Sequence, residues 1–242
     1  MSDQTVLDPG TEVTIDSFVD GLWLEEGLAK NTLEAYRRDL NLFALWLLTQ
    51  RQQTLVNATE ADINAYFSAR HLATKATTAN RRLTVFKRYY RWALRERLVQ
   101  ADPTLKLQAA KQALRVPKTL TEAQVEALLT APPVDTPLGL RDRAMLELMY
   151  ASGLRVSELV DLRVSNIGMN EGVLRVFGKG AKERLVPFGQ VAREWLVRYL
   201  ADARPAILGG QQTEDMFVTQ RGSGMTRVMF WMIVKKHAEA AH

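Results

Sequence analysis

The chain has 242 residues, of which 47% are hydrophobic, and its formal net charge at pH 7 is +5. These values indicate a folded protein of one or two domains, and the lack of cysteine excludes a disulfide framework and a thiolate metal site. The positive charge favours a polyanionic partner. We expect a cytoplasmic protein, because the sequence shows neither a signal-peptide pattern nor an apolar run of membrane-spanning length.

The first half of the chain has the residue pattern of helices only. Apolar residues recur at intervals of three and four, and they predict helices over residues 11–28, 31–50, 59–70 and 77–99. Asn31 and Glu34 resemble a capping box at the start of the second helix, and Thr59 is placed to cap the third. We therefore expect an all-helical N-terminal domain over residues 1–105.

Residues 106–118 interrupt the helical pattern. Pro103 and Pro117 lie near the two ends of this stretch, where they disfavour a continuous helix. Its charged residues are all basic: Lys106, Lys111, Arg115 and Lys118. The stretch is therefore predicted to be a basic linker between two domains.

The second domain is predicted over residues 119–242, where helical and strand patterns mix. Thr121 and Gln124 predict a capping box, and Gly153 predicts the left-handed end of a further helix. The remaining expected elements are a hairpin of Val173–Phe177 and Arg184–Phe188, a helix over 190–203, a strand Asp215–Thr219 and a helix from Thr226. The predicted fold class is mainly α: an all-helical domain, then a mixed, mostly helical domain with a small antiparallel β-sheet.

Arg155 follows the predicted helix end at Gly153 and precedes a helix that is expected to begin near Ser157. The first turn of a helix presents unpaired N–H groups and a positive dipole, so an arginine beside it adds to an anion site. This position favours phosphate as the ligand. The structural alternative is that Arg155 pairs with Glu158 or packs over the Gly153 turn.

The predicted fourth helix has a dense basic face. Over residues 75–97 it contains a single acid, Glu96, beside a large set of cations: Lys75, Arg81, Arg82, Lys87, Arg88, Arg91, Arg95 and Arg97. Solvated faces usually mix both signs of charge, so a one-sided face favours nucleic acid over ordinary solvation. A membrane partner is disfavoured, because the apolar face of the helix is needed for the core. Arg37 and Arg38 lie on the polar side of the second predicted helix, so two helices of this domain could contact the duplex. The residues expected to contact DNA in this domain are Arg37, Arg38, Arg81, Arg82, Lys87, Arg88 and Arg91.

Lys179 lies between two glycines at the turn of the predicted hairpin, with Lys182 and Arg184 just beyond it. Exposed lysines are common at turns, so one interpretation is an ordinary charged hairpin tip. The other is that the hairpin delivers a lysine into a groove or to a reacting phosphate, as a proton donor or a point charge.

Several motifs occur together in a specific order and spacing. They are NTLEAYRRDL (31–40), LTEAQVEALL (120–129), LRDRAMLELMYASGLRVSELVDL (140–162), GKGAKERLVP (178–187) and MTR (225–227) with Phe230 and Trp231. With these motifs the chain resembles tyrosine recombinases of the phage integrase family, of the XerC/XerD type and most closely its XerD branch. The resemblance implies site-specific DNA recombination through a phosphotyrosine intermediate, of the kind that resolves chromosome dimers, without a metal or other cofactor.

The resemblance also assigns roles to particular residues. It makes Arg155 a catalytic arginine that holds the scissile phosphate, and Lys179 the lysine that protonates the leaving 5′-oxygen. We add Lys182, Arg184 and Arg227 to the residues expected to contact DNA.

The family's active site further needs a His-x-x-Arg motif, another His or Trp, and a nucleophilic tyrosine. No histidine of this chain is followed three residues later by arginine, and its tyrosines all fall in predicted helices. We therefore expect a C-terminally truncated recombinase, with residues 119–242 as the first part of its catalytic domain, that binds DNA but does not cleave it.

The resemblance implies three partners: a double-stranded recombination site, a XerC-like recombinase in a heterotetramer, and a septal DNA translocase as activator. No membrane partner is expected. The alternative function is a non-catalytic DNA-binding protein that occupies or regulates recombination sites.

Overall fold

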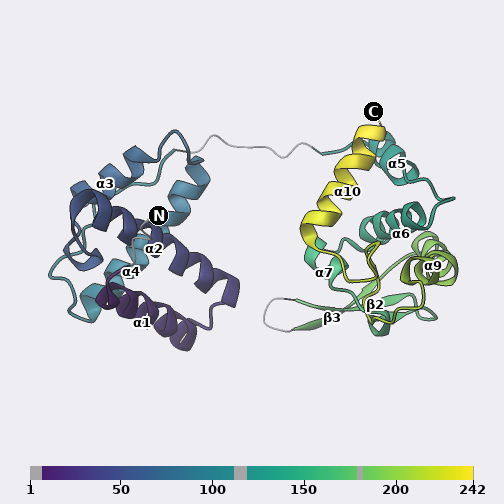
Figure 1. The fold of residues 1–242 in the computed structure, drawn as a ribbon, viewed down its shortest axis with the longest axis horizontal. Helices are drawn as coiled ribbons and strands as arrows, with labels where there is room; N and C mark the ends of the chain where they lie inside the picture. The colour runs from purple at the N-terminus through teal and green to yellow at the C-terminus, as the bar shows by residue number, and fades with distance from the viewer. Residues whose placement is uncertain (1–6, 112–118, 179–181, 242) are drawn as a thin grey trace. The chain divides into compact units, whose positions relative to one another are not determined.

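The computed structural model describes residues 7–111, 119–178 and 182–241. The chain divides into two compact units, Met1–Val116 and Pro117–His242, which are treated one at a time below. It is mainly helical with a small antiparallel sheet, as the sequence predicts (Figure 1). Among the described residues, no helix is both long and apolar enough to cross a bilayer.

The described part of the first unit contains the four α-helices that the sequence predicts. They are α1 (Pro9–Glu26), α2 (Lys30–Arg51), α3 (Glu60–Ala69) and α4 (Ala76–Arg95), with a short 3-10 helix η1 (Leu55–Asn57) before α3. Thr59 caps α3 as predicted, in a capping box with Asp62. The predicted cap of α2 is wrong, because its N-cap is Ala29, which makes no side-chain hydrogen bond. The predicted end of α4 is also too late, because Arg97 adopts a left-handed φ of 58°.

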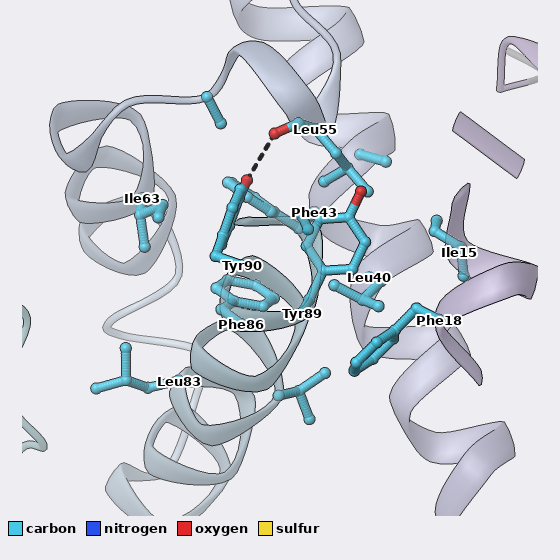
Figure 2. Packing of buried hydrophobic residues seen from close by; sticks show 14 of the residues in the cluster. Ile15, Phe18, Leu40, Phe43, Leu55, Ile63, Leu83, Phe86, Tyr89 and Tyr90 are labelled. Carbon is cyan, nitrogen blue, oxygen red and sulfur yellow. Dashed lines mark hydrogen bonds between the residues drawn. The ribbon is translucent and has the colours of Figure 1, made fainter. Parts of the chain in front are cut away.

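The core of the first unit is built around aromatic rings in contact. The ring of Phe43 on α2 lies 4.6 Å from Phe86 on α4 and 4.9 Å from Tyr66 on α3, measured between centroids. Figure 2 shows the Tyr90 hydroxyl pointing at the Leu55 carbonyl oxygen, to which it donates a hydrogen bond of 2.8 Å. All four helices therefore contribute apolar faces to this core, which leaves the polar faces of α2 and α4 toward solvent.

The stretch predicted as a linker begins on the first unit. Leu107 is part of the buried core, and its carbonyl oxygen accepts a hydrogen bond of 2.7 Å from Lys87 Nζ. Asn80 exchanges two hydrogen bonds with the backbone of Ala110, at 2.8 and 2.9 Å. Residues 106–110 thus pack against α4, and the rest of the predicted linker, 112–118, lies outside the described residues.

The second unit contains a three-stranded antiparallel sheet of order β1-β2-β3. The strands are β1 (Ile167–Gly168), β2 (Val173–Phe177) and β3 (Glu183–Pro187), and β2 and β3 pair from Val173↔Pro187 to Phe177↔Glu183. The helical elements are α5 (Glu122–Thr130), α6 (Pro137–Ser152), α7 (Val156–Val160), η2 (Val164–Asn166), α8 (Gln190–Arg198), the π-helical turn η4 (Tyr199–Ala203), α9 (Arg204–Leu208) and α10 (Arg227–Ala240). The predicted hairpin and the predicted helix after Thr226 are both present.

Local signals in the second unit agree with the structure except at one segment. Thr121 and Gln124 form the predicted capping box, and Gly153 ends α6 with a left-handed φ of 60°. The predicted strand Asp215–Thr219 is wrong, since the segment makes only isolated bridges. Its apolar residues are buried instead beneath Tyr199, whose hydroxyl donates to the Met216 carbonyl oxygen at 3.0 Å.

A buried polar cluster attaches α10 to α6. His237 Nε2 lies 2.9 Å from Asp142 Oδ2, and Arg141 donates to Asp142 Oδ1 and, through Nη1, to the Val218 carbonyl oxygen at 2.9 Å. All three charged or titratable side chains are almost fully buried. Each therefore needs the others as partners, which fixes where α10 packs.

Two buried tyrosines of the first unit provide a matched test of this packing. Replacing Tyr90 by Phe should lower the free energy of unfolding by about 1 kcal/mol, because the buried Leu55 carbonyl loses its 2.8 Å donor and keeps only the Ala58 N–H at 3.3 Å. Replacing Tyr66 by Phe should leave stability unchanged or slightly raised, since the buried Tyr66 hydroxyl has no hydrogen-bond partner among the described residues. Urea unfolding measures both, and equal losses for the two variants would contradict the assignment.

Candidate phosphate site and nucleic-acid interface

Arg155 lies in the short turn between α6 and α7. Gly153 closes α6 with an N–H···O bond of 2.9 Å to Met149, and Leu154 anchors the turn in the core with 3% of its surface exposed. Arg155 is the N-cap residue of α7, and 74% of its side chain is exposed. Because α7 has only five residues, its dipole is small, and the guanidinium itself must supply most of the attraction for an anion.

The Arg155–Glu158 pair that the sequence allows is present, and a second arginine joins it. Arg155 donates to Glu158 through its backbone N–H at 2.9 Å and through Nη1 at 3.0 Å. Arg184 on β3 donates to both oxygens of the same carboxylate, Nη1 to Oε1 and Nη2 to Oε2, each at 2.9 Å. Glu158 therefore holds two guanidinium groups side by side, while most of the Arg155 side chain stays open to solvent.

The Glu158 carboxylate is held firmly in its charged form. The hydrogen bonds from Arg184, followed by those from Arg155, lower its pKa from 4.5 to about 2, against the opposing effect of burial. Its side chain is only 7% exposed, so little of the carboxylate is open to solvent. Two arginines and one carboxylate leave this cluster with one net positive charge, which suits a phosphodiester.

The base of the β2–β3 hairpin lies beside this cluster. Gly178 donates its N–H to the Lys182 carbonyl oxygen at 2.8 Å, and a Cβ at Gly178 would lie 3.5 Å from Arg184 Nη1. Lys182 is exposed. Lys179, the predicted catalytic lysine, lies outside the described residues, so its role stays a prediction.

Arg227 is the first residue of α10 and is exposed. Its helix is capped by Thr226, whose hydroxyl accepts from the Met229 N–H at 3.2 Å, and α10 packs against α7 (Figure 1). Within the described residues, no hydrogen bond or ion pair joins Arg227 to the Glu158 cluster.

The cations predicted to contact DNA in the first unit fall into two groups. Arg38 and Arg91 are exposed and make no ion pair with any described residue. The others have partners: Arg37 pairs with Asp16, Arg81 and Arg82 with Asp39, Arg88 with Glu26, and Lys87 with the Leu107 carbonyl oxygen. The basic face of α4 is one-sided along its own sequence, but α1 and α2 bring carboxylates to it.

Asp39 and Glu158 are two acids that the sequence argument did not select as organising residues. The Asp39 side chain is 1% exposed and receives Arg81 and Arg82. A signal for Asp39 was available, since it lies three residues after Tyr36 and four before Phe43, on the apolar stripe of α2. A buried acid on such a stripe requires a cationic partner.

The described residues offer no metal site, since no three His, Asp or Glu side chains among them come together as ligands. The chemistry available to the described part is that of guanidinium groups, which bind phosphate oxygens by paired planar hydrogen bonds.

The Glu158 cluster predicts a pH-dependent contribution to stability. Because the folded pKa of Glu158 is lowered to about 2 from 4.5, its contribution is complete above pH 4.5 and is lost as the pH falls toward 2. Glu158→Gln should lower the free energy of unfolding at neutral pH by about 1–2 kcal/mol. This figure allows for screening of the ion pairs by solvent, since both arginines are exposed. Urea unfolding at neutral pH and near pH 3 should show the difference shrinking with acidity.

The control is Glu214→Gln, which removes the exposed partner of Arg163, a carboxylate whose side chain is 75% exposed. It should change stability by less than about 0.5 kcal/mol at either pH. A Glu158→Gln effect no larger than that of the control would mean that the shared carboxylate does not hold the cluster together.

Comparison with known proteins gives consistent matches along the chain. The model of the phage integrase family matches residues 118–242, and that of the phage integrase N-terminal SAM-like domain matches residues 15–97. Tyrosine recombinase XerD of Ralstonia nicotianae is 60% identical over 97% of the chain and 76% of the relative's length, and that of Proteus mirabilis is 47% identical over 100% and 78%. The chain thus spans about three quarters of the length of these relatives.

Solved structures agree on the fold. A lambda integrase tetramer bound to a Holliday junction superposes with a TM-score of 0.71 at 20% identity, over 99% of this chain and 65% of that one. The XerH recombinase bound to a palindromic difH substrate gives 0.69 at 14% identity, over 98% and 81%. With family models matched in both units and relatives this similar over nearly the whole chain, the chain belongs to the phage integrase family of tyrosine recombinases.

Proposed function

We propose that this chain is the DNA-binding part of a site-specific recombinase that resolves chromosome dimers by cleaving and rejoining strands through a phosphotyrosine intermediate. The observation that carries the proposal is the exposed Arg155 guanidinium, held with Arg184 by one buried carboxylate in a chain 60% identical to a XerD recombinase. In this proposal residues 1–105 grip the duplex and residues 119–242 begin the catalytic domain, in the cytoplasm.

Arg155 has a defined chemical role in the proposed reaction. When a nucleophile attacks a phosphodiester, negative charge builds on the nonbridging oxygens, and a planar guanidinium stabilises it by two directed hydrogen bonds. Glu158 orients this guanidinium through Nη1 at 3.0 Å and leaves its remaining donors for the phosphate. Lys179 would protonate the leaving 5′-oxygen, and the phosphotyrosine bond would conserve the energy needed for rejoining.

The 242 residues of this chain are proposed to bind DNA without cleaving it. Four of the six tyrosines, Tyr66, Tyr89, Tyr90 and Tyr199, are completely buried, and burial raises the pKa of Tyr199 to about 12. Tyr36 lies under the Arg88 guanidinium and Tyr150 is exposed, but both precede Arg155 and neither follows a His-x-x-Arg motif. No tyrosine is therefore placed as the family's nucleophile.

The partners in this proposal are a double-stranded recombination site, a XerC-like recombinase in a heterotetramer and a septal DNA translocase as activator. The similarity to XerD proteins and to a lambda integrase tetramer on a Holliday junction supports a DNA partner and an assembly of several subunits. The second candidate is a non-catalytic protein that occupies or regulates recombination sites.

Duplex binding by this chain should depend strongly on salt. With about 6 phosphate contacts, the affinity should fall on the order of a thousandfold between about 50 and 200 mM salt. Replacing Arg38 and Arg91 by Gln should reduce the slope of log affinity against log salt by about 2, since each contributes one contact. Fluorescence anisotropy with a labelled duplex measures both slopes. A salt-independent affinity would exclude these cations as the DNA-binding surface.

Arg155→Lys should separate catalysis from folding. In this chain extended with the C-terminal residues of the Ralstonia nicotianae relative, the substitution should slow strand cleavage by about a hundredfold to a thousandfold, because lysine lacks the planar fork. Duplex affinity should change little, since lysine keeps the positive charge and Arg155 is one phosphate contact among several. Cleavage is measured on a nicked suicide substrate in a denaturing gel, with the melting temperature of each variant recorded.

The unextended chain is the control and should give no covalent protein–DNA band. A variant with normal cleavage and a lowered melting temperature would show that Arg155 is a structural cap. A covalent band from the unextended chain would show that one of its own tyrosines is the nucleophile.

A further inference from the structure

Helices α1 and α4 carry opposite charges along their whole lengths. Within its bounds α1 contains five acidic residues and no basic one, whereas α4 contains six basic residues and no acid. The two helices pack together within the first unit, and α1 also packs against α2. The acids of α1 therefore lie near the cations that are proposed to grip DNA.

Three arginines of α2 and α4 are paired with carboxylates of α1. Asp16 Oδ1 accepts from Arg37 Nη2 at 2.7 Å and from Nε at 3.0 Å, and Glu25 accepts from Arg95 at 2.8 and 3.1 Å. The third is the Glu26–Arg88 pair. In each pair the carboxylate presents oxygens to a guanidinium as a DNA phosphate would.

These pairs differ in kind from the buried pair at Asp39. The Asp39 side chain is 1% exposed, so separating it from Arg81 and Arg82 would leave a charge without water or partner. Asp16 is 59% exposed and Glu26 is 44% exposed, so both can separate from their arginines into solvent. Exposed ion pairs contribute little to stability, and a phosphate can replace the carboxylate.

We propose that Asp16 and Glu26 restrain DNA binding by competing with DNA phosphates for Arg37 and Arg88. Asp16 occupies Nε and Nη2 of Arg37, and Glu26 and Tyr36 occupy the two Nη groups of Arg88, whereas Arg155 gives Glu158 only Nη1 of its guanidinium. Arg37 and Arg88 must therefore leave their carboxylates to bring the full guanidinium fork to a phosphate, and each released carboxylate then lies close to the DNA and repels it. The restraint lowers the affinity for duplex DNA in general, because non-specific binding rests almost entirely on phosphate contacts. This inference rests on the proposed DNA-binding function of the first unit.

The chain offers a matched pair of variants for the test. Asp16→Asn with Glu26→Gln removes two paired acids, and Glu12→Gln with Asp20→Asn removes two exposed acids of α1 that have no ion pair among the described residues. Both double variants change the net charge by the same amount. Any difference between them therefore reports the loss of the pairs and not the change in overall charge.

The measurement is the affinity for a random-sequence duplex at about 100 mM salt, by fluorescence anisotropy. The paired-acid variant should bind about fivefold more tightly than the unaltered chain, and the control variant less than twofold more tightly. Adding Arg37→Gln and Arg88→Gln to the paired-acid variant should abolish the gain. Circular dichroism melts confirm that every variant is folded.

Equal gains from both double variants would overturn the inference, because net charge alone would then explain them. No gain from the paired-acid variant would also overturn it, since Arg37 and Arg88 would not be limited by their carboxylates. A folded, unaltered chain that does not bind duplex DNA at any salt concentration is a different result, and it would refute the proposed function itself.

Discussion

The candidate phosphate site depends on a single carboxylate shared by two arginines. Glu158 receives Arg155 from the turn after α6 and Arg184 from β3, so one acid connects a helix start to a strand. An exposed arginine alone would sample many rotamers, and ordering it on a ligand would cost conformational entropy. The pair with Glu158 restricts the rotamers of Arg155 before any ligand binds, which lowers that entropy cost. The Arg155–Glu158 ion pair is thus compatible with phosphate binding and is not evidence for a purely structural role.

The same arrangement recurs in the first unit with a different consequence. Asp39 also joins two arginines, but the carboxylate is buried on the core side of α2, and Arg82 is only 13% exposed. Removing both arginines there would leave the buried carboxylate uncompensated. Arg81 and Arg82 are consequently best understood as residues that hold α4 to α2, and the exposed Arg38 and Arg91 are the better placed to contact DNA.

Local sequence signals predicted the elements, because each depends on neighbouring residues. The capping box at Thr121 and the left-handed Gly153 are examples, and the apolar stripes gave all four helices of the first unit within a few residues. The prediction of a strand over Asp215–Thr219 failed because an apolar run of strand length can equally be a buried loop. Its partners are distant in sequence, such as Tyr199 and the Leu162 carbonyl oxygen, and the local pattern does not show them. Ion pairs between residues far apart in sequence cannot be predicted from the spacing of residues within one element.

This limit matters most for charge. The sequence of α4 shows which residues are basic, but whether a given arginine is free depends on acids that lie elsewhere in the chain, such as Asp39, which is 42 residues before Arg81. Folding thereby sorts one basic helix into arginines that stabilise the unit, arginines held by exposed carboxylates, and arginines open to solvent. Only the last two groups can bind a phosphate without leaving a buried carboxylate unpaired. The first unit therefore has fewer cations available for DNA than its composition suggests.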